Sequence, residues 1–293
     1  MRKQFVVTSE RLLESDPRLF ILLGDIGVFA FRRSLQKYPE RVLNIGILEQ
    51  ATVSVAAGLA KEGFIPLFHS IAPFVVERAF EQIKVDFGYQ KQGGNFVSVG
   101  ASYDYASLGC THHCPGDVGI LATIPGMEVV VPGHPHEYDV LFQEAYADGQ
   151  PTYYRLSERS NSKAQDVRFG RAQVLKQGTG VTIIAVGVLL DKVLKAVEGT
   201  DATVLYYTTV LPFDRETLAQ NCSSGRILCV EPFYQGTLAS EIMEAMSGRF
   251  IRLSSLGVPR KFLRNYGHAD LHDADCGFTV ENIRHQIEEL SRA

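Results

Sequence analysis

Short apolar runs alternate with amphipathic runs along this chain, and that alternation limits the possible folds more than any other feature. The apolar runs are rich in β-branched or aromatic residues and end in Gly or polar turn residues, which is typical of strands. They cover residues 19–23, 41–45, 64–68 and 95–99. Apolar side chains at helical spacing lie between them, at residues 31–38, 50–61 and 73–86. The pattern predicts an α/β fold with a mostly parallel sheet and helices on both faces.

The alternation continues to residue 156, stops, and then restarts. Before the stop, it predicts strands at 127–131 and 152–156 and a helix at 136–147. The polar stretch SERSNSKAQDV, residues 157–167, lacks periodicity and bulk and is predicted to be a linker. After it come predicted strands at 181–186, 203–207, 227–230 and 250–253 and helices at 191–197, 214–219, 238–246 and 280–290. We therefore expect two α/β domains, residues 1–160 and 168–293.

Charge and composition exclude several classes of partner. The formal net charge is −4, and no Lys/Arg block is present that would follow a phosphate backbone, so nucleic acid is not expected to bind. The longest apolar run, VTIIAVGVLL, is too short to span a membrane. The N-terminus lacks the apolar segment of a secretory signal, and five cysteines without framework spacing fit a reducing compartment. We expect a cytoplasmic protein that has no membrane span and no structural disulfide.

A carboxylate interrupts the apolar stretch LNIGILEQ. Glu49 follows a strand-like run that closes on Gly46 and precedes a run of small residues that favours a helix. It is therefore predicted to lie at a strand-to-helix junction, where ligands of open α/β sheets commonly bind. Burial of the carboxylate would cost several kcal/mol without a partner. The alternative is an N-terminal helix residue that complements the helix dipole, and the octapeptide alone leaves both open.

Cysteine and histidine are concentrated in LGCTHHCPGD, which begins at Leu108. All four of Cys110, His112, His113 and Cys114 are potential zinc ligands. Within five consecutive residues, however, they can hardly surround one tetrahedral ion, and we predict no metal ligand here. A catalytic loop in which a His transfers a proton and a Cys nucleophile are the other two interpretations.

Two further stretches have both structural and functional interpretations. GDIG at Gly24 follows a strand and lacks the third glycine of a dinucleotide fingerprint, so nucleotide binding by that route is excluded and the structural interpretation is an Asp-Gly turn. Phe74 falls in the first turn of the predicted helix that begins at Pro73. It packs in the core or presents a flat face to a planar ring.

Taken in order, the motifs resemble the C-terminal half of a transketolase. They read GDIG, GILEQ, AAGLA, GFIP, FVVERAFEQI, GCTH and VVVPGHPHE, followed by TIIAVG, LPFD, VEPF and LGVP. The resemblance covers essentially the whole chain. It implies a pyrimidine-binding domain followed by a transketolase C-terminal domain, and it implies thiamine diphosphate with Mg²⁺ as the cofactors.

The resemblance assigns roles to the residues that match the family motifs. In this family the glutamate of G-I-x-E bonds the pyrimidine N1′ and thereby helps to activate the cofactor, which implies that Glu49 is catalytic. A buried carboxylate suits such proton sharing because burial disfavours its charged form. His112 matches the histidine that faces the substrate and stabilises the developing alkoxide or moves its proton. Phe74 is implied to lie against the aminopyrimidine ring.

Other matches imply a wider site. Cofactor contacts are implied for Ile47, for Asp25 across a subunit contact, and for Ile71, where transketolases commonly have an aromatic. Substrate contacts are implied for three residues: His113 in place of a Gln, His69, and Arg155 as the holder of an anionic acceptor.

The pattern that binds the diphosphate is not among these motifs. Thiamine diphosphate enzymes use G-D-G and a later Asn to hold Mg²⁺ and the diphosphate, and this sequence has no such segment. The resemblance therefore implies a partner subunit of the diphosphate-binding, transketolase N-terminal type, which binds the Mg²⁺, and a heterotetramer. Two alternatives share the fold, namely the beta subunit of a 2-oxo acid dehydrogenase and a catalytically silent assembly subunit. The T-H-H loop and R-A-F-E-Q-I favour the transketolase type, and Glu49 argues against a silent subunit.

One departure from the family bears on the substrate. Transketolases commonly have an Asp that recognises a donor hydroxyl where this chain has Leu108. A leucine would leave that polar group unpaired, which is costly. We expect a transferase that moves a two-carbon ketol or acyl unit from a ketose or 2-oxo acid donor to an aldehyde-type acceptor, with a donor that is less hydroxylated than usual.

Overall fold

Residues 1–292 are described by a computed structural model, which contains two open sheets flanked by helices. Seven strands form the first sheet in the order β10-β5-β6-β4-β3-β1-β2, and only the pairing of β10 with β5 is antiparallel. The strands are β1 (Leu19–Leu23), β2 (Val42–Asn44), β3 (Ile65–Ile71), β4 (Gly94–Val99), β5 (Glu128–Val130), β6 (Pro151–Arg155) and β10 (Thr209–Leu211). The expected α/β architecture with mostly parallel sheets is confirmed.

The second sheet has five strands in the order β12-β11-β8-β9-β7. They are β7 (Gln173–Lys176), β8 (Thr182–Val186), β9 (Thr203–Tyr207), β11 (Arg226–Tyr234) and β12 (Arg252–Val258), with only β7 antiparallel to its neighbour. Central strands such as β8 and β9 are buried along their whole length, which explains why they read as continuous apolar runs in the sequence.

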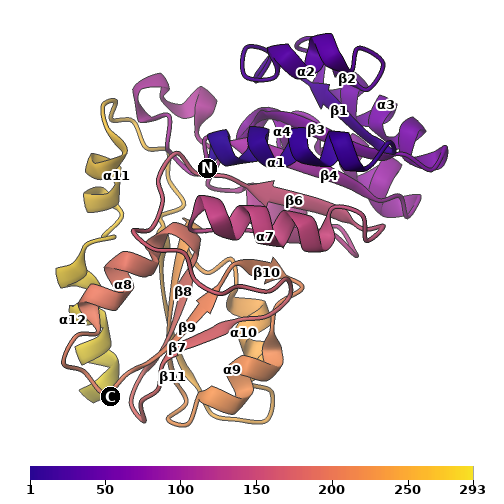
Figure 1. Cartoon of the computed structure of the whole chain (residues 1–293). Coiled ribbons are helices and arrows are strands. Elements are labelled where there is room, and N and C mark those ends of the chain that lie inside the picture. Colours follow the sequence, from indigo (N-terminus) through magenta and orange to yellow (C-terminus); the bar gives the residue numbers. More distant parts are fainter. Residues whose placement is uncertain (293) are drawn as a thin grey trace.

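Helices cover both faces of each sheet (Figure 1). In the first half of the chain they are α1 (Arg2–Ser15), α2 (Arg32–Lys37), α3 (Glu49–Lys61), α4 (Ala72–Val75), α5 (Phe80–Gln82), α6 (Asp117–Leu121) and α7 (Pro135–Ala145). A π-helical turn, η1 (Ile83–Tyr89), and two 3₁₀ turns, η2 (Ala106–Leu108) and η3 (Cys110–His112), accompany them. In the second half they are η4 (Gly187–Leu189), α8 (Leu190–Ala196), α9 (Arg215–Asn221), α10 (Ala239–Ala245), α11 (Ala269–Asp275) and α12 (Val280–Arg292).

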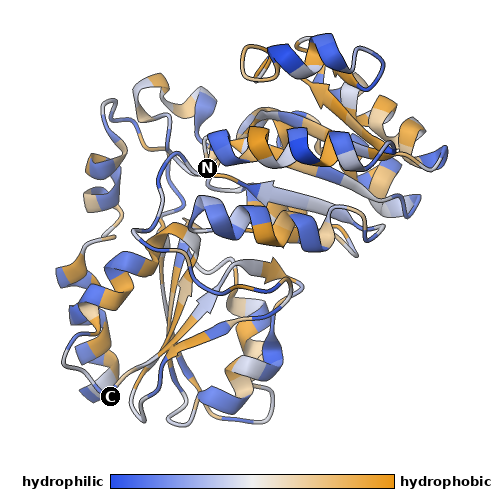
Figure 2. Ribbon diagram, in the orientation of Figure 1, coloured by the Kyte–Doolittle hydropathy of each residue, from blue (hydrophilic) through white to orange (hydrophobic). Residues whose placement is uncertain are grey.

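Many strands are coloured as hydrophobic, whereas the helices alternate between hydrophobic and hydrophilic residues (Figure 2). One buried cluster runs from α1 and α7 through the first sheet to β8 and α12, and includes Phe5, Tyr138, Ile183 and Ile287. The two sheets are therefore connected by a continuous apolar core rather than by the linker alone.

Several sequence predictions differ from the structure, and the strand expected at 250–253 is found at Arg252–Val258. The single helix expected at 73–86 is wrong, because this segment is divided into α4, α5 and the π-helical η1. Strand β10, which lies in the part of the chain expected to form the second domain, pairs with β5 of the first sheet. Residues 157–167 contain neither helix nor strand, as expected of a linker. Among residues 1–292, no helix has the length and apolar character needed to cross a membrane.

Candidate active site

The candidate site residues come from four parallel strands whose carboxyl ends meet at one edge of the first sheet. Leu23 of β1 is in register with Asn44 of β2 and with His69 of β3, and β4 lies beside β3. The segments that leave these strands carry Asp25, Glu49, Phe74 and the loop from residue 100 to 114. Ligands of open α/β sheets bind at this edge, so the topology brings together motifs that lie up to 90 residues apart.

Glu49 is the first residue of α3, as its position at a strand-to-helix junction predicted. Its side chain is only 1 % exposed, and its Oε1 accepts a hydrogen bond from Nη1 of Arg78 at 2.8 Å. The dipole of α3 also favours a negative charge in the first turn. Both interpretations of the sequence therefore apply: Glu49 complements the helix, and it is a buried carboxylate with a specific partner.

Phe74, Arg78 and His112 continue from Glu49 as a contiguous row, which we call the Glu49–His112 row. Phe74 lies in the first turn after β3, as predicted, and Cζ of Arg78 lies 4.1 Å from the centre of its ring. The ring of His112 approaches Phe74 edge to face, with the two ring centres 5.4 Å apart. The row thus combines a buried carboxylate, a planar cation, an aromatic face and an imidazole.

A backbone bridge and close glycine packing hold the loop that carries His112. Ser102 and Cys114 pair as an isolated antiparallel bridge, so the two ends of the loop are joined. Gly109 has φ of 72°, and a Cβ at this position would lie 2.6 Å from Tyr266, so only glycine fits. Nδ1 of His112 lies 2.9 Å from the hydroxyl oxygen of Thr111. Leu108, which stands where transketolases commonly have an Asp, is 49 % exposed at the start of the turn.

His113 faces away from the row, toward the second half of the chain. It is buried, and its ring lies edge to face with His272 of α11 at 5.5 Å between ring centres. Burial, with the neighbouring His272 and His112, lowers the pKa of His113 to about 4. The structure therefore places His113 in the contact between the loop and α11, and not beside His112 as a second donor to the substrate.

Asp25 and Ile47 follow the ends of β1 and β2, and Ile71 is the last residue of β3; the three differ in exposure. Asp25 is exposed with φ of 64°, and its backbone N–H donates to Oδ1 of Asn44 at 3.0 Å. It also lines a pocket of about 720 Å³ with Arg2, Lys3 and Phe29 among its walls. Ile47 is exposed, whereas Ile71 is buried in the core at the end of β3.

Arg155 is not placed to hold an anionic substrate. The side chain is 2 % exposed, and its Nε donates to Oδ2 of Asp117 at 2.7 Å. A second nitrogen, Nη2, donates to the hydroxyl of Ser102 at 2.8 Å. The resemblance implied an anion contact for Arg155, but the guanidinium is committed to a buried ion pair, and that expectation is corrected.

His69 is likewise a core residue rather than a substrate ligand. It is fully buried on β3, its Nδ1 lies 2.8 Å from the carbonyl oxygen of Val97, and its ring packs on Phe5 of α1 at 4.6 Å between centres. Burial lowers the pKa of His69 to about 4. The expectation that it contacts the substrate is corrected for the same reason as Arg155: the strand position turns the side chain into the core.

The Cys/His stretch separates into diverging side chains. Cys110 lines a surface pocket with Phe262 and Tyr266, whereas Cys114 is fully buried. Burial raises the pKa of the Cys114 thiol well above its usual value, which disfavours the thiolate that a nucleophile requires. The rings of His112 and His113 have different neighbours, Phe74 and His272 respectively, and the interpretation as a catalytic loop stays a prediction.

Arg78 is the residue that the sequence reasoning missed. Arg78 lies within the motif FVVERAFEQI, and the resemblance assigns no role to it. The signal was its spacing, because residues four apart on a helical turn are neighbours, and Phe74 and Arg78 are four apart. Its pairing with Glu49, 29 residues away, had no local signal.

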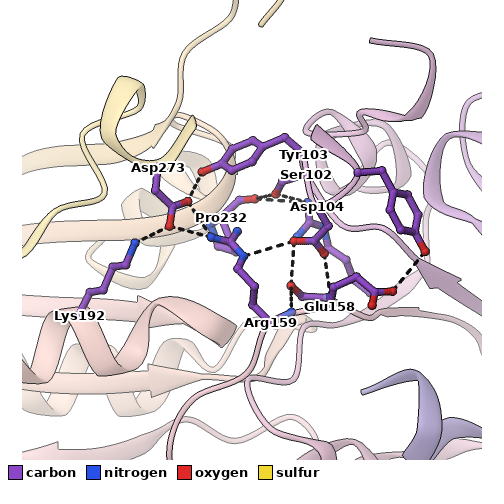
Figure 3. A network of polar contacts seen from close by, with 11 residues as sticks. Ser102, Tyr103, Asp104, Glu158, Arg159, Lys192, Pro232 and Asp273 are labelled. Carbon is purple, nitrogen blue, oxygen red and sulfur yellow. Dashed lines mark hydrogen bonds and ion pairs between the residues drawn. The ribbon is translucent and has the colours of Figure 1, made fainter. Parts of the chain in front are cut away.

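An ion-pair network anchors the base of the loop to the linker and to α11 (Figure 3). Arg159 of the linker donates to Asp273 of α11 at 2.7 Å and to Asp104 of the loop at 3.3 Å. Lys192 also pairs with Asp273, and the hydroxyl of Tyr103 donates to the same carboxylate at 2.6 Å. The network connects the segment that carries His112 to the second sheet.

Comparison with known proteins gives the same family over both halves of the chain. The model of "Transketolase, pyrimidine binding domain" matches residues 1–163, and that of "Transketolase, C-terminal domain" matches residues 170–283. An uncharacterized 33.6 kDa protein of the fasciation locus of Rhodococcoides fascians is 39 % identical, over 98 % of this chain and 93 % of the relative.

Two further comparisons carry functional descriptions. The 6-deoxy-6-sulfo-D-fructose transketolase subunit of Clostridium sp. (strain MSTE9) is 30 % identical, over 99 % of this chain and 94 % of that protein. Among solved structures, one described as "Split gene transketolase, inactive beta4 tetramer" aligns with a TM-score of 0.86 and 28 % identity, covering 99 % of this chain and 97 % of that one.

Proposed function

The chain belongs to the transketolase family, and on that premise we propose that it is the pyrimidine-binding subunit of a split, thiamine diphosphate-dependent transferase. The observation that carries the proposal is the buried Glu49, which is linked through Arg78 to the Phe74–His112 pair at the carboxyl edge of the first sheet. Transketolases depend on thiamine diphosphate, which supplies the electron sink for cleaving and forming the carbon–carbon bond.

The residues of the row fit the pyrimidine half of that cofactor. A carboxylate that is 1 % exposed can share a proton with a ring nitrogen, since water does not compete for it. Phe74 offers an aromatic face of the size of a pyrimidine ring. We assign to Glu49 the proton exchange with the aminopyrimidine and to Phe74 the orientation of that ring.

His112 is the residue proposed to act on the substrate. It adjoins Phe74, and the hydroxyl of Thr111 orients its Nδ1. From this position the imidazole would donate a hydrogen bond to the oxygen that gains negative charge, or move the proton of that oxygen. Asp25 and Ile47 border the same edge and are proposed to contact the cofactor where the partner meets this chain; Ile71 is proposed to support the ring from the core.

We further propose that this chain is inactive without a partner that binds the diphosphate and Mg²⁺. Two similarities support it. The Clostridium relative is named as a subunit, and the solved neighbour is described as a split-gene transketolase that is inactive as a tetramer of its beta chain. By extension, the active form would be a heterotetramer of this chain with a transketolase N-terminal-type subunit.

The donor is proposed to be a ketose or 2-oxo acid with fewer hydroxyl groups near the scissile bond than an ordinary sugar phosphate. The exposed Leu108 supports this, because a leucine offers no partner to a donor hydroxyl. The transferred group is a two-carbon ketol or acyl unit, and the acceptor is an aldehyde.

The test is co-purification of the chain with its partner, followed by calorimetric titration of thiamine diphosphate in the presence of Mg²⁺. We expect binding by the complex and none by the chain alone. In the complex, Glu49→Gln should lower kcat by about 10²- to 10⁴-fold, the range of general acid–base catalysis, with the Kd for the cofactor changed by less than about tenfold. Unchanged activity of the Glu49→Gln complex would remove the catalytic assignment.

A further inference from the structure

Arg78 occupies the place between the two residues proposed to hold the pyrimidine ring. Its guanidinium bonds the Glu49 carboxylate at 2.8 Å and covers Phe74, with Cζ 4.1 Å from the ring centre. A planar group at that distance is in van der Waals contact with the aromatic face. No second planar group can lie between the guanidinium and Phe74.

The arrangement satisfies a carboxylate that would otherwise be buried without a partner. Burying a charged group costs several kcal/mol unless it is paired, and Arg78 is the hydrogen-bond partner of the Glu49 side chain among the described residues. The Arg78 side chain is 38 % exposed, so it can turn out into solvent without disturbing the core. Glu49 is buried in the first turn of α3, whereas the side chain of its partner is in contact with solvent.

We propose that Arg78 is an internal placeholder for the aminopyrimidine: it pairs with Glu49 and stacks on Phe74 in the unliganded chain, and it leaves when the cofactor binds. A guanidinium and an aminopyrimidine are both flat, but the ring nitrogen of a neutral aminopyrimidine accepts hydrogen bonds, as does a carboxylate. The exchange therefore keeps Glu49 paired when one proton is taken up from water and shared between the carboxyl group and that nitrogen. The inference rests on the proposed function and adds to it a residue that sets cofactor affinity without belonging to the bound site.

The placeholder has a thermodynamic consequence with a definite sign. The ion pair must break before the cofactor binds, so Arg78 stabilises the unliganded state more than the liganded one, and linkage then requires that it weakens cofactor binding. Removal of Arg78 should therefore destabilise the protein without cofactor and lower the Kd for the cofactor. A residue that supports the bound cofactor would give the opposite sign for affinity.

The experiment compares wild type, Arg78→Ala and Arg78→Gln in the reconstituted complex with Mg²⁺. Calorimetric titration with thiamine diphosphate should give a Kd about five- to tenfold lower for Arg78→Ala. The change should be smaller and in the same direction for Arg78→Gln, whose neutral amide keeps N–H donors but cannot form an ion pair. Without cofactor, both variants should melt below wild type, and saturation with cofactor should narrow that gap. Arg215→Ala, which removes an exposed ion pair with Glu241 in the second half of the chain, is the matched control and should leave the Kd unchanged.

Two different results would refute the placeholder alone or the placeholder together with the proposed function. Equal or weaker binding by Arg78→Ala and Arg78→Gln, with normal binding by wild type, refutes the placeholder and leaves the proposed function intact. Failure of the wild-type complex to bind the cofactor refutes the proposed function and the placeholder with it. If Arg78→Ala does not fold, the direction of the Kd change in Arg78→Gln alone decides whether Arg78 is a placeholder.

Discussion

Two buried polar side chains at the carboxyl edge of the first sheet differ in how they are satisfied. Glu49 has a charged partner that reaches it from solvent, whereas His69 has the carbonyl of Val97 at one nitrogen and no partner at Nε2. Both lie in motifs of the same resemblance, and both were assigned to the site. Only the contacts separate a residue with an exchangeable partner from one that belongs to the core.

His69 makes the stability of the chain depend on pH in a predictable direction. Burial lowers its folded-state pKa to about 4, below the value of about 6.5 in an unfolded chain. The unfolded state therefore binds the proton more readily, and the stability contributed by neutral His69 is complete above pH 6.5 and is lost as pH falls toward 4. Between pH 7 and 5 the loss should be about 2 kcal/mol.

The measurement is the free energy of unfolding by urea at pH 7 and pH 5 for wild type and His69→Gln. The variant should lose about 2 kcal/mol less than wild type over this interval, whatever its stability at pH 7. His285→Gln, at an exposed histidine of α12, is the control and should keep the wild-type difference. An equal pH dependence in His69→Gln would contradict the assignment of His69 as a neutral core residue.

At the scale of elements, strands were predicted better than helices, for a physical reason. Residues 19–23, 95–99 and 203–207 are buried on both faces, so their apolar runs identify them locally, and the structure confirms them to within a residue. The segment expected to be one helix at 73–86 keeps its apolar spacing but is interrupted after Val75 and continues into a π-helical turn, whose i→i+5 hydrogen bonds the apolar pattern does not indicate. Strand β10 has three residues and a partner about 80 residues away, which no local pattern indicates.

The same distinction applies to the candidate site. Glu49, Phe74 and His112 were identified because each lies in a motif of fixed spacing, and the structure brings them into one row. The burial of Arg155 and the turn of His113 toward His272 depend on residues more than 35 positions away, Asp117 and α11 respectively. The sequence could not distinguish these from exposed ligands.

One glycine at the junction of three elements tests this packing. A Cβ at Gly133, in the turn before α7, would lie 2.2 Å from Asn161 of the linker, 2.2 Å from Tyr206 of β9 and 2.6 Å from the backbone oxygen of Gly187. Gly133→Ala should therefore lower the free energy of unfolding by about 1–3 kcal/mol through overpacking.

Gly58 in α3 is the matched control, because a Cβ at this position would have no neighbour atom within 4 Å beyond the adjacent residues and the helix backbone. Gly58→Ala should stabilise the isolated chain by about 0.5–1 kcal/mol. Urea unfolding of both variants checks the pair, and equal effects of the two alanines would contradict the close packing at Gly133.

At the scale of the whole molecule, the two sheets are joined by apolar packing and by the network around Asp273 (Figure 3). Asp273 receives Arg159, Lys192 and Tyr103, which come from the linker, α8 and the His112 loop. Although burial opposes ionisation, Arg159 and the hydrogen bonds of Lys192 and Tyr103 hold the pKa of Asp273 below its usual value. Its stabilising effect is therefore present above about pH 4, the unfolded value, and is lost as pH falls below it.

Asp273→Asn should loosen the loop that carries His112 as well as destabilise the chain. The substitution leaves Arg159 with Asp104 as its remaining carboxylate and removes the partner of Lys192. Breaking a buried ion pair from one side costs about 3–5 kcal/mol. Since Arg159 is 28 % exposed, we expect a loss of about 2–3 kcal/mol in the free energy of unfolding.

Hydrogen exchange at pH 7 should become faster in residues 101–114 and 157–161, while β3 and β4 keep their protection relative to global unfolding. Lys192→Met removes only the partly exposed ion pair between Lys192 and Asp273. It should have less than half the effect of Asp273→Asn on the free energy of unfolding and on the exchange rates of the loop. If Asp273→Asn speeds exchange equally throughout the chain, the network stabilises the fold as a whole and does not specifically position the loop.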